Sequence, residues 1–476
     1  MISKAGSTAV FSVAALYGAV VVCLAGPGFA SFDTAYQWWM ARHLSVSTLW
    51  PPTYVYSFYL LDTLVPWLDA PTSWFFINLV LSCLSAAGLA VLCARSSFGA
   101  LLALLAVLFT PVFWLLIPHV WSDVALVSVL LAVTLLLLVA SREDQSPPMR
   151  RTAVVGSFLG LFLACGIRHN AVAAAFPLMG YWLLVLPSAW SGSQKRISPL
   201  VAVLVGGVVA CLFFAVHVFV GTLLSKDRAD TWAITAIWDL QAISVESGVN
   251  LVPKSISPDT NVADLQASFD ATNAVYMYTK SEARWVNSTL GLKASERADL
   301  RDAWWVAVKG RPREYLQHRL RATAAMIGAP TTGHMGTRVE PAQTPFGDNP
   351  RREFWWPSGQ SYWSRVAATM SPSLLCSPSL TQITALFAFV GAAIRLKRRG
   401  AWSAIRSALP PGQAALAVSV LLSGATYLAG LFVTVPTADM RYGFWPALAF
   451  VLAAILICTT SPAETSSSLP TIKPAS

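Results

Sequence analysis

The chain has 476 residues, of which 55% are hydrophobic and 12% are charged, and its mean hydropathy is +0.57. A soluble domain carries roughly 25% charged residues, so this composition excludes an ordinary soluble protein and indicates a chain embedded in lipid. The net charge of +10 has a simple origin, because Lys and Arg gather in the cytoplasmic loops of membrane proteins. No basic stripe with interleaved aromatics indicates nucleic-acid binding, and the seven cysteines form no CxxC pair that would indicate a zinc site.

Apolar stretches long enough to cross a bilayer recur along the chain. A hydrocarbon core of about 30 Å requires roughly 20 apolar residues per helix, and inside lipid each segment must pair its own backbone groups. The expected spans are 8–29, 72–93, 99–117, 122–140, 152–168, 171–187, 199–223, 374–394, 412–434 and 442–460. The predicted fold class is therefore an all-α integral membrane protein with about ten transmembrane helices.

Positive charge in the connections between spans predicts the orientation. One set of connections, together with the termini, carries thirteen Lys or Arg residues, whereas the alternate set carries only Arg42, Arg168 and Arg441. Because Lys and Arg accumulate on the cytoplasmic side, both termini are predicted to be cytoplasmic. The remaining seventeen basic and fifteen acidic residues fall in 224–373, a segment too long to enter this count.

These features divide the chain into four predicted regions. They are an N-terminal transmembrane module 1–223 with a first outer loop 31–71, an extracytoplasmic domain 224–373, a three-span module 374–460 and a disordered cytoplasmic tail 461–476. In the outer domain, the helical periodicity of 295–322 is broken by Gly310-Arg-Pro312, which predicts two helices. Thr231–Ser247 mixes Trp and Ile with few charges and is expected to lie along the membrane surface, and 331–359 is expected to be a loop.

Polar residues gather at the predicted outer ends of the spans, although the orientation count did not use acidic residues, His or Asn. The acidic members there are Asp33, Asp62, Asp69, Asp123 and Asp439. Polar groups at membrane depth are costly, so each is a functional candidate. Asp33 follows the first span, where a carboxylate against an apolar wall can act as a general base; its alternative role is a helix N-cap.

A second candidate pair is His119 and Asp123, four residues apart. If that stretch is helical, the two side chains share one face and could bind a metal or hold a phosphate-bearing partner. The alternative for Asp123 is an N-cap at the start of the next span.

Two short polar clusters complete the predicted site. Arg168, His169 and Asn170 lie between two spans joined by almost no loop, and an arginine at that depth needs an anionic partner such as a lipid-borne phosphate, unless it snorkels to the interface. Asp439 and Arg441, with Tyr442 beside them, precede the last span, and Arg441 either binds phosphate or pairs locally with Asp439.

The order of these motifs resembles the GT-C class of membrane glycosyltransferases, which use polyprenyl-phosphate-linked sugars, and is most similar to multi-span bacterial members. Asp33 matches the class's catalytic carboxylate in the first outer loop. The other matching stretches are Trp50-Pro-Pro-Thr53, Trp121-Ser-Asp-Val124, Arg168-His-Asn170, Trp238-Asp-Leu-Gln-Ala-Ile-Ser244, Arg311-Pro-Arg-Glu-Tyr-Leu-Gln-His-Arg319 and Asp439-Met-Arg-Tyr442. The resemblance covers about 8–460 and implies a bacterial inner-membrane enzyme of cell-envelope polysaccharide biosynthesis. Many members carry a second acidic residue where this chain has Thr34, so the need for a divalent metal stays open and no metal ligand is assigned.

The resemblance implies inverting sugar transfer on the outer face. Asp33 would accept the proton of the acceptor hydroxyl, and Arg168 or Arg441 would hold the donor phosphate. His119, Asp123, His169, Asn170, Asp439 and Tyr442 would support them. The acceptor, a glycan, lipid or protein, is not implied. A ligase for a lipid-linked glycan, a transporter or flippase for such a glycan, and a non-catalytic scaffold remain alternatives.

Overall fold

The computed structural model describes residues 2–191, 197–279, 291–329, 342–370, 373, 376–398 and 412–460. The predicted tail 461–476 and the first part of the predicted loop 331–359 lie outside this set. Within it, nine helical segments are long and apolar enough to cross a membrane. They are α1 (Lys4–Ala25), α4 (Ala70–Cys93), α7 (Ser122–Ser141), α8 (Pro147–Ile167), α9 (Ala171–Ser191), α10 (Pro199–Leu224), α17 (Pro378–Arg398), α19 (Gln413–Thr434), and α20 (Phe444–Thr459) with the 3₁₀ turn η4 (Met440–Gly443) before it.

The predicted span 99–117 is broken in two. Helix α5 (Ser97–Leu108) ends before Thr110, and the short helix α6 (Pro111–Leu116) starts anew. Proline has no N–H to donate and forces the residue before it out of helical geometry, so the apolar run cannot stay one helix. The expected span 99–117 is therefore not one continuous helix.

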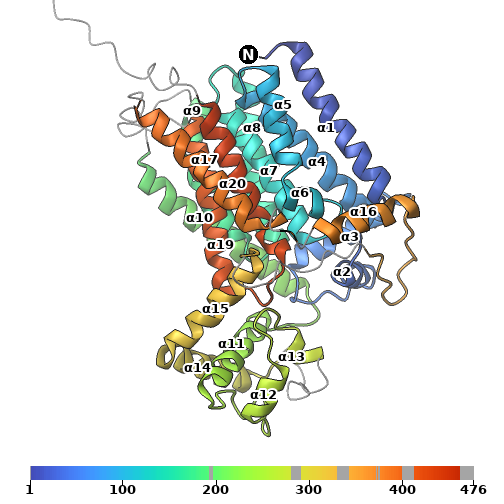
Figure 1. Ribbon diagram of the computed structural model, residues 1–476, viewed down its shortest axis with the longest axis vertical. Coiled ribbons are helices and arrows are strands. Elements are labelled where there is room, and N and C mark those ends of the chain that lie inside the picture. The colour runs from blue at the N-terminus through green and yellow to red at the C-terminus, as the bar shows by residue number, and fades with distance from the viewer. Residues whose placement is uncertain are drawn as a thin grey trace, which may run out of the picture.

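The long helices form one bundle, seen in the upper part of Figure 1. Helices α7 and α20 are the most enclosed by protein, whereas only about a quarter of the residues of α1 and α10 are buried, as in lipid-facing helices. Small residues allow the closest approach between α9 and α10: a Cβ on Gly206 would lie 2.5 Å from the backbone nitrogen of Gly180. This is the small-residue packing expected of helices in a membrane.

The predicted first outer loop, 31–71, folds into two helices, α2 (Phe32–Arg42) and α3 (Pro52–Leu64). Asp62 ties them together, because it accepts hydrogen bonds from Trp38 Nε1 and from the Ala70 backbone N–H, each at 2.7 Å. Asp69 caps α4 by accepting the Thr72 N–H at 2.6 Å. Both candidate acids therefore have structural roles.

A second hydrophobic core lies at the end of the bundle opposite the N-terminus (Figure 1). Its helices are α11 (Thr231–Ser247), α12 (Val262–Ser268), α13 (Tyr276–Thr279), α14 (Ala294–Gly310) and α15 (Pro312–Met326). The predicted break at Gly310-Arg-Pro312 is confirmed. The surface position expected for α11 is wrong: Ile237 and Trp238 are fully buried, so its lack of charge reflects burial within this small helical unit. A further helix, α16 (Pro357–Met370), packs on α1.

Candidate functional site

Arg441 lies at the centre of a group of charged side chains where α20 begins. Its Nη1 is 2.7 Å from Asp33 Oδ2, and its Nε is 3.1 Å from Asp439 Oδ2. Asp439 also accepts the backbone N–H of Arg441 at 3.0 Å, which fixes the turn η4. The local pair expected of Asp439 and Arg441 is therefore present, and the guanidinium also reaches Asp33 on α2.

Asp123 connects this arginine to a second one. The Asp123 carboxylate is only 3% exposed, and its Oδ2 lies 2.5 Å from Arg168 Nη1 and 4.0 Å from Arg441 Nε. Arg168 also donates to Ser122 Oγ at 3.1 Å and to Asn170 Oδ1 at 3.3 Å. We call Asp33, Asp123, Arg168, Asp439 and Arg441 the charged cluster.

Aromatic rings enclose the two guanidinium groups. The Tyr442 ring centre lies 5.0 Å from Arg168 Cζ and 5.3 Å from Arg441 Cζ, and the Trp121 ring centre lies 5.2 Å from Arg441 Cζ. Attraction between each cation and the negative face of a ring helps to hold two like charges close together.

The charged cluster has three carboxylates and two guanidinium groups, which gives a formal charge of −1. Its carboxylates differ in accessibility: the side chain of Asp33 is 33% exposed, against 16% for Asp439 and 3% for Asp123. An incoming anion would therefore replace Asp33 at Arg441 with the least desolvation. Asp123 Oδ1 is buried without a hydrogen-bond partner, so this carboxylate is held by its contacts on one side only.

Neither Asp33 nor Asp123 is the N-cap that the alternative prediction proposed. The N-cap positions are Ser31 and Trp121, and each aspartate lies in the first turn of its helix. A helix N-terminus stabilises a nearby negative charge, so α2 and α7 both direct favourable dipoles at the charged cluster.

Backbone contacts bring these two helix starts together. Val120 N–H donates to Phe29 O at 3.0 Å, Thr34 Oγ1 donates to Val120 O at 2.6 Å, and Trp121 Nε1 donates to Ser31 Oγ at 2.7 Å. Thr34 is buried, and its hydroxyl makes one of these contacts.

The helical pairing expected of His119 and Asp123 is wrong. His119 precedes α7 in a bridge with Phe29, because helix α7 starts only at Ser122. Its ring stacks on Trp121 with centres 4.1 Å apart, so it supports the ring that covers Arg441. Among the residues that the structure describes, no group of three or more His, Cys, Asp and Glu is arranged to hold a metal ion.

The predicted Arg168-His169-Asn170 cluster is only partly brought into the site. Asn170 accepts from Arg168, whereas His169 packs near Phe214 on α10, with ring centres 6.4 Å apart. Burial, together with the charge of Arg168, lowers the pKa of His169 to about 4, so its ring is neutral at physiological pH. His169 therefore lies as a neutral ring beside Phe214 and the backbone of Thr48.

The sequence predicted no role for two buried arginines. Arg352, whose side chain is 5% exposed, pairs with Asp69 at 3.1 Å and donates to Pro27 O at 2.9 Å, fastening the start of α4 to the end of α1. Arg319 is fully buried beside Asp239 in the small helical unit. Both lie in the long segment set aside from the charge count, and nothing in the sequence around Arg352 distinguishes it from Arg351.

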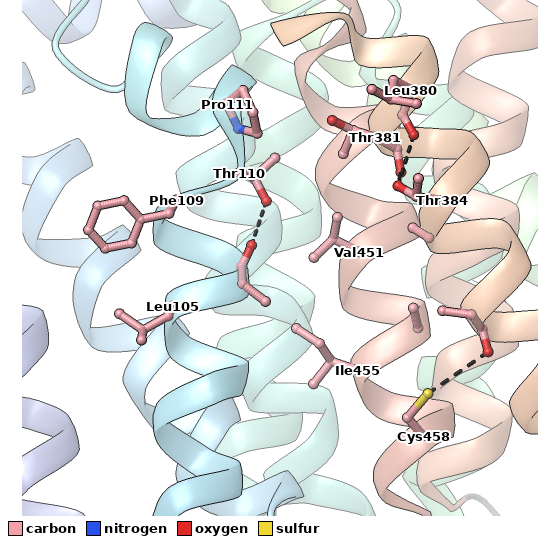
Figure 2. Close-up of a pocket in the computed structure, with 14 residues that line it drawn as sticks. Leu105, Phe109, Thr110, Pro111, Leu380, Thr381, Thr384, Val451, Ile455 and Cys458 are labelled. Atoms are coloured by element: carbon pink, nitrogen blue, oxygen red, sulfur yellow. Dashed lines mark hydrogen bonds between the residues drawn. The ribbon is translucent and has the colours of Figure 1, made fainter. Parts of the chain in front are cut away.

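A lateral groove of about 660 Å³ runs along the bundle between α5, α6, α17 and α20 (Figure 2). Its lining is apolar apart from threonine hydroxyls and Cys458, and the hydroxyls of Thr110 and Thr384 are bonded to their own helices. No member of the charged cluster lines it. Val451, the lining residue on α20 nearest to Arg441 in sequence, is ten residues further on, or roughly 15 Å along a helix.

Comparisons with known proteins give little more. No protein-family model and no curated protein matches the chain. Two solved structures align with it: ArnT from Cupriavidus metallidurans bound to undecaprenyl phosphate, at 13% identity over 96% of this chain and 78% of that one with a TM-score of 0.33, and the apo form of ArnT, at 14% identity over 95% and 77% with a TM-score of 0.32. TM-scores of this size do not establish a common fold.

Proposed function

We propose that the protein is a membrane glycosyltransferase that moves a sugar from a polyprenyl-phosphate donor to a glycan, lipid or protein acceptor on the outer face of the membrane. The observation that carries the proposal is the 2.7 Å contact between Asp33 and Arg441, which are 408 residues apart in sequence. It joins a partly exposed carboxylate to a guanidinium group at the end of a membrane bundle. These are the two groups that transfer from a sugar phosphate requires.

The reaction follows from the chemistry of these groups. Asp33 accepts the proton of the acceptor hydroxyl while that oxygen attacks the anomeric carbon from the side opposite the phosphate. The bond between the anomeric carbon and the phosphate oxygen breaks, and its electron pair leaves with the polyprenyl phosphate. The phosphate thereby gains one negative charge, Asp33 becomes neutral, and the anomeric configuration is inverted.

Donor binding prepares the base in this mechanism. While Asp33 pairs with Arg441, the guanidinium group already has an anion at its more exposed edge. A donor phosphate takes that place, because Asp33 is the most exposed of the three carboxylates. Asp33 then loses its counterion and can accept a proton, and Arg441 faces the oxygen on which charge develops. Asp123 keeps Arg168 and Arg441 together during this exchange.

The membrane setting supports a lipid-borne donor. The charged cluster lies where several long apolar helices end, so a headgroup there has its chain in the bilayer. The groove in Figure 2 offers apolar walls of α17 and α20 within the bundle to such a chain. The outer-face assignment rests on the charge of the connections, since the set with thirteen Lys or Arg residues is the one predicted to be cytoplasmic.

Masses of cell-envelope glycans and of polyprenyl-linked sugars test the proposal. Cells would carry the wild type, a deletion, Asp33→Asn, or Asp144→Asn at matched membrane abundance. Asp144→Asn is the matched control, because Asp144 also pairs with an arginine, Arg142 at 2.7 Å, but follows α7 at its far end. We expect deletion and Asp33→Asn to remove the same single sugar increment and Asp144→Asn to leave it.

The other outcomes separate the alternatives. If deletion removes the increment but Asp33→Asn does not, Asp33 is not the base, and a transporter or scaffold explains the loss better. If a whole glycan block is lost from its lipid, rather than one sugar, the protein is a ligase. An unchanged glycan in the deletion refutes a role in the pathway.

A further inference from the structure

The segment that leads into Arg441 is held from outside the bundle. After α19 ends at Thr434, residues 435–438 run beside the small helical unit before η4 begins. The Ala438 N–H donates to Thr272 O at 2.6 Å, and the Ala274 N–H donates to Pro436 O at 2.9 Å. These reciprocal bonds make the short antiparallel bridge between Asn273 and Thr437. We call residues 435–438 the clamped segment.

Arg319 holds the start of the clamped segment. Its Nη1 donates to the backbone carbonyl of Val435 at 2.8 Å, and its Nη2 pairs with Asp239 Oδ2 at 2.7 Å. Both charged side chains have 0% exposure. The Asp239 carboxylate accepts a further hydrogen bond from Trp304 Nε1 at 2.8 Å, which fixes the ion pair within the small helical unit. The other terminal nitrogen of Arg319 bonds the clamped segment.

Stability alone does not explain why a buried ion pair lies at this position. A buried ion pair is costly to desolvate and is often no more stabilising than apolar residues of the same size. A guanidinium can hold a carboxylate with one nitrogen and a carbonyl with the other in a fixed plane, which neither an apolar side chain nor a lysine can do. The ion pair thus fixes the small helical unit to one backbone atom of the clamped segment, the carbonyl oxygen of Val435.

The position of that atom matters for the charged cluster. Val435 is six residues before Arg441, and Ala438 directly precedes Asp439, whose carboxylate bonds both the backbone and the side chain of Arg441. A shift of the clamped segment would therefore change the position of Asp439 and Arg441 relative to Asp33 on α2. We propose that Arg319 is a positioning residue that sets the place of Arg441 opposite Asp33. The inference rests on the proposed function in one respect, namely that Arg441 is the ligand of the donor phosphate.

The test uses Arg319→Lys in the full-length protein, with Arg321→Lys as the matched control. A lysine keeps the charge beside Asp239, but it is shorter and lacks the planar pair of donors that hold Asp239 and Val435 O together. Arg321 lies on the same helix, but it is exposed and pairs with Glu246 at 3.7 Å. In case Arg319→Lys fails to fold, Thr235→Val removes a separate bond to the neighbouring Thr434 O, at 3.2 Å, without altering the buried pair.

Two measurements are made on each purified protein: hydrogen exchange of backbone amides, and binding of undecaprenyl phosphate. We expect Arg319→Lys to speed the exchange of the Ala438 and Arg441 amides by about ten- to a hundredfold, the effect of losing one charge-assisted hydrogen bond, with α7 unchanged. Thr235→Val should give a smaller change at the same amides, and Arg321→Lys none. Undecaprenyl phosphate should bind at least about tenfold more weakly to Arg319→Lys.

The results separate this inference from the proposed function. Exchange in 435–443 that stays at the wild-type rate, or that rises equally in α7, overturns the positioning role. Unchanged lipid-phosphate binding together with faster local exchange overturns it as well. If the wild type itself binds no undecaprenyl phosphate, the proposed function fails, and the exchange rates alone decide whether Arg319 positions Arg441.

Discussion

Asp123 gives the sharpest test of the charged cluster, because Asp123→Asn changes one charge and little volume. The aspartate is 3% exposed, and its partner Arg168 is 18% exposed, so the variant leaves a mostly buried guanidinium without its anion. Breaking a buried pair in this way costs about 3–5 kcal/mol. Arg168 keeps its bonds to Ser122 and Asn170, which favours the low end, at about 3 kcal/mol.

The assay is reversible unfolding in mixed micelles, followed by tryptophan fluorescence as denaturing detergent is added. Asp144→Asn is again the matched control, since that carboxylate is 38% exposed and its pair with Arg142 is worth about 0.2–1 kcal/mol. The double variant Asp123→Asn with Arg168→Gln removes both buried charges. Its loss of unfolding free energy should be smaller than the sum of the losses of the two single variants, because no unpaired ion remains.

Two results would refute this reasoning. The first is a loss of unfolding free energy for Asp123→Asn that does not exceed the loss for Asp144→Asn. The second is a double variant whose loss equals the sum of the single losses, which would mean that Asp123 and Arg168 do not interact.

Two further predictions concern other parts of the molecule. Burial and the neighbouring Arg319 lower the pKa of His318 to about 3, so the native state keeps this ring neutral while the unfolded chain protonates it below about pH 6.5. The stability of the wild type should therefore fall, relative to His318→Gln, by up to about 1.4 kcal/mol per pH unit as the pH drops below 6.5, and parallel unfolding curves would contradict this. Asp239, whose pKa is raised by burial, acts with the opposite sign but is present in both proteins. In the bundle, Gly206→Ala should lower unfolding stability by about 1–3 kcal/mol, since its Cβ would lie 2.5 Å from the Gly180 backbone. Gly391→Ala, which meets nothing within 4 Å, should not, and equal effects would exclude the close packing of α9 on α10.

The sequence predicted the membrane class and the gathering of Asp33, Asp123, Arg168 and Arg441, because span length and the polar ends of spans are local properties. It could not predict which groups pair. Arg441 was expected to pair with Asp439 or to bind phosphate, and its contact with Asp33 depends on how α20 and α2 are placed in the folded bundle. The domain boundaries 1–223, 224–373 and 374–460 stay a prediction.

The errors have specific physical causes. Thr231–Ser247 was taken for a surface helix because few charges and a tryptophan fit an interface and a buried core equally well. His119 was paired with Asp123 on the premise of a helix that in fact starts only at Ser122. The break before Pro111 has a local cause and could have been predicted, because a helix interior rarely tolerates a Thr-Pro step. The apolar residues on both sides made the stretch resemble one continuous span.

In the proposed function, the greater exposure of Asp33 favours it over the two neighbouring carboxylates as the base. Asp123 and Asp439 each contact arginines while nearly or largely buried, so releasing either one exposes an uncompensated ion to a low dielectric. Asp33 can lose Arg441 and still reach solvent. A donor phosphate that replaces it at Arg441 keeps the arginine paired and leaves a carboxylate with no cation of its own. In the proposed mechanism, the same exchange would place the leaving group at Arg441 and free Asp33 to take the proton of the acceptor hydroxyl, so donor binding would be coupled to acceptor activation.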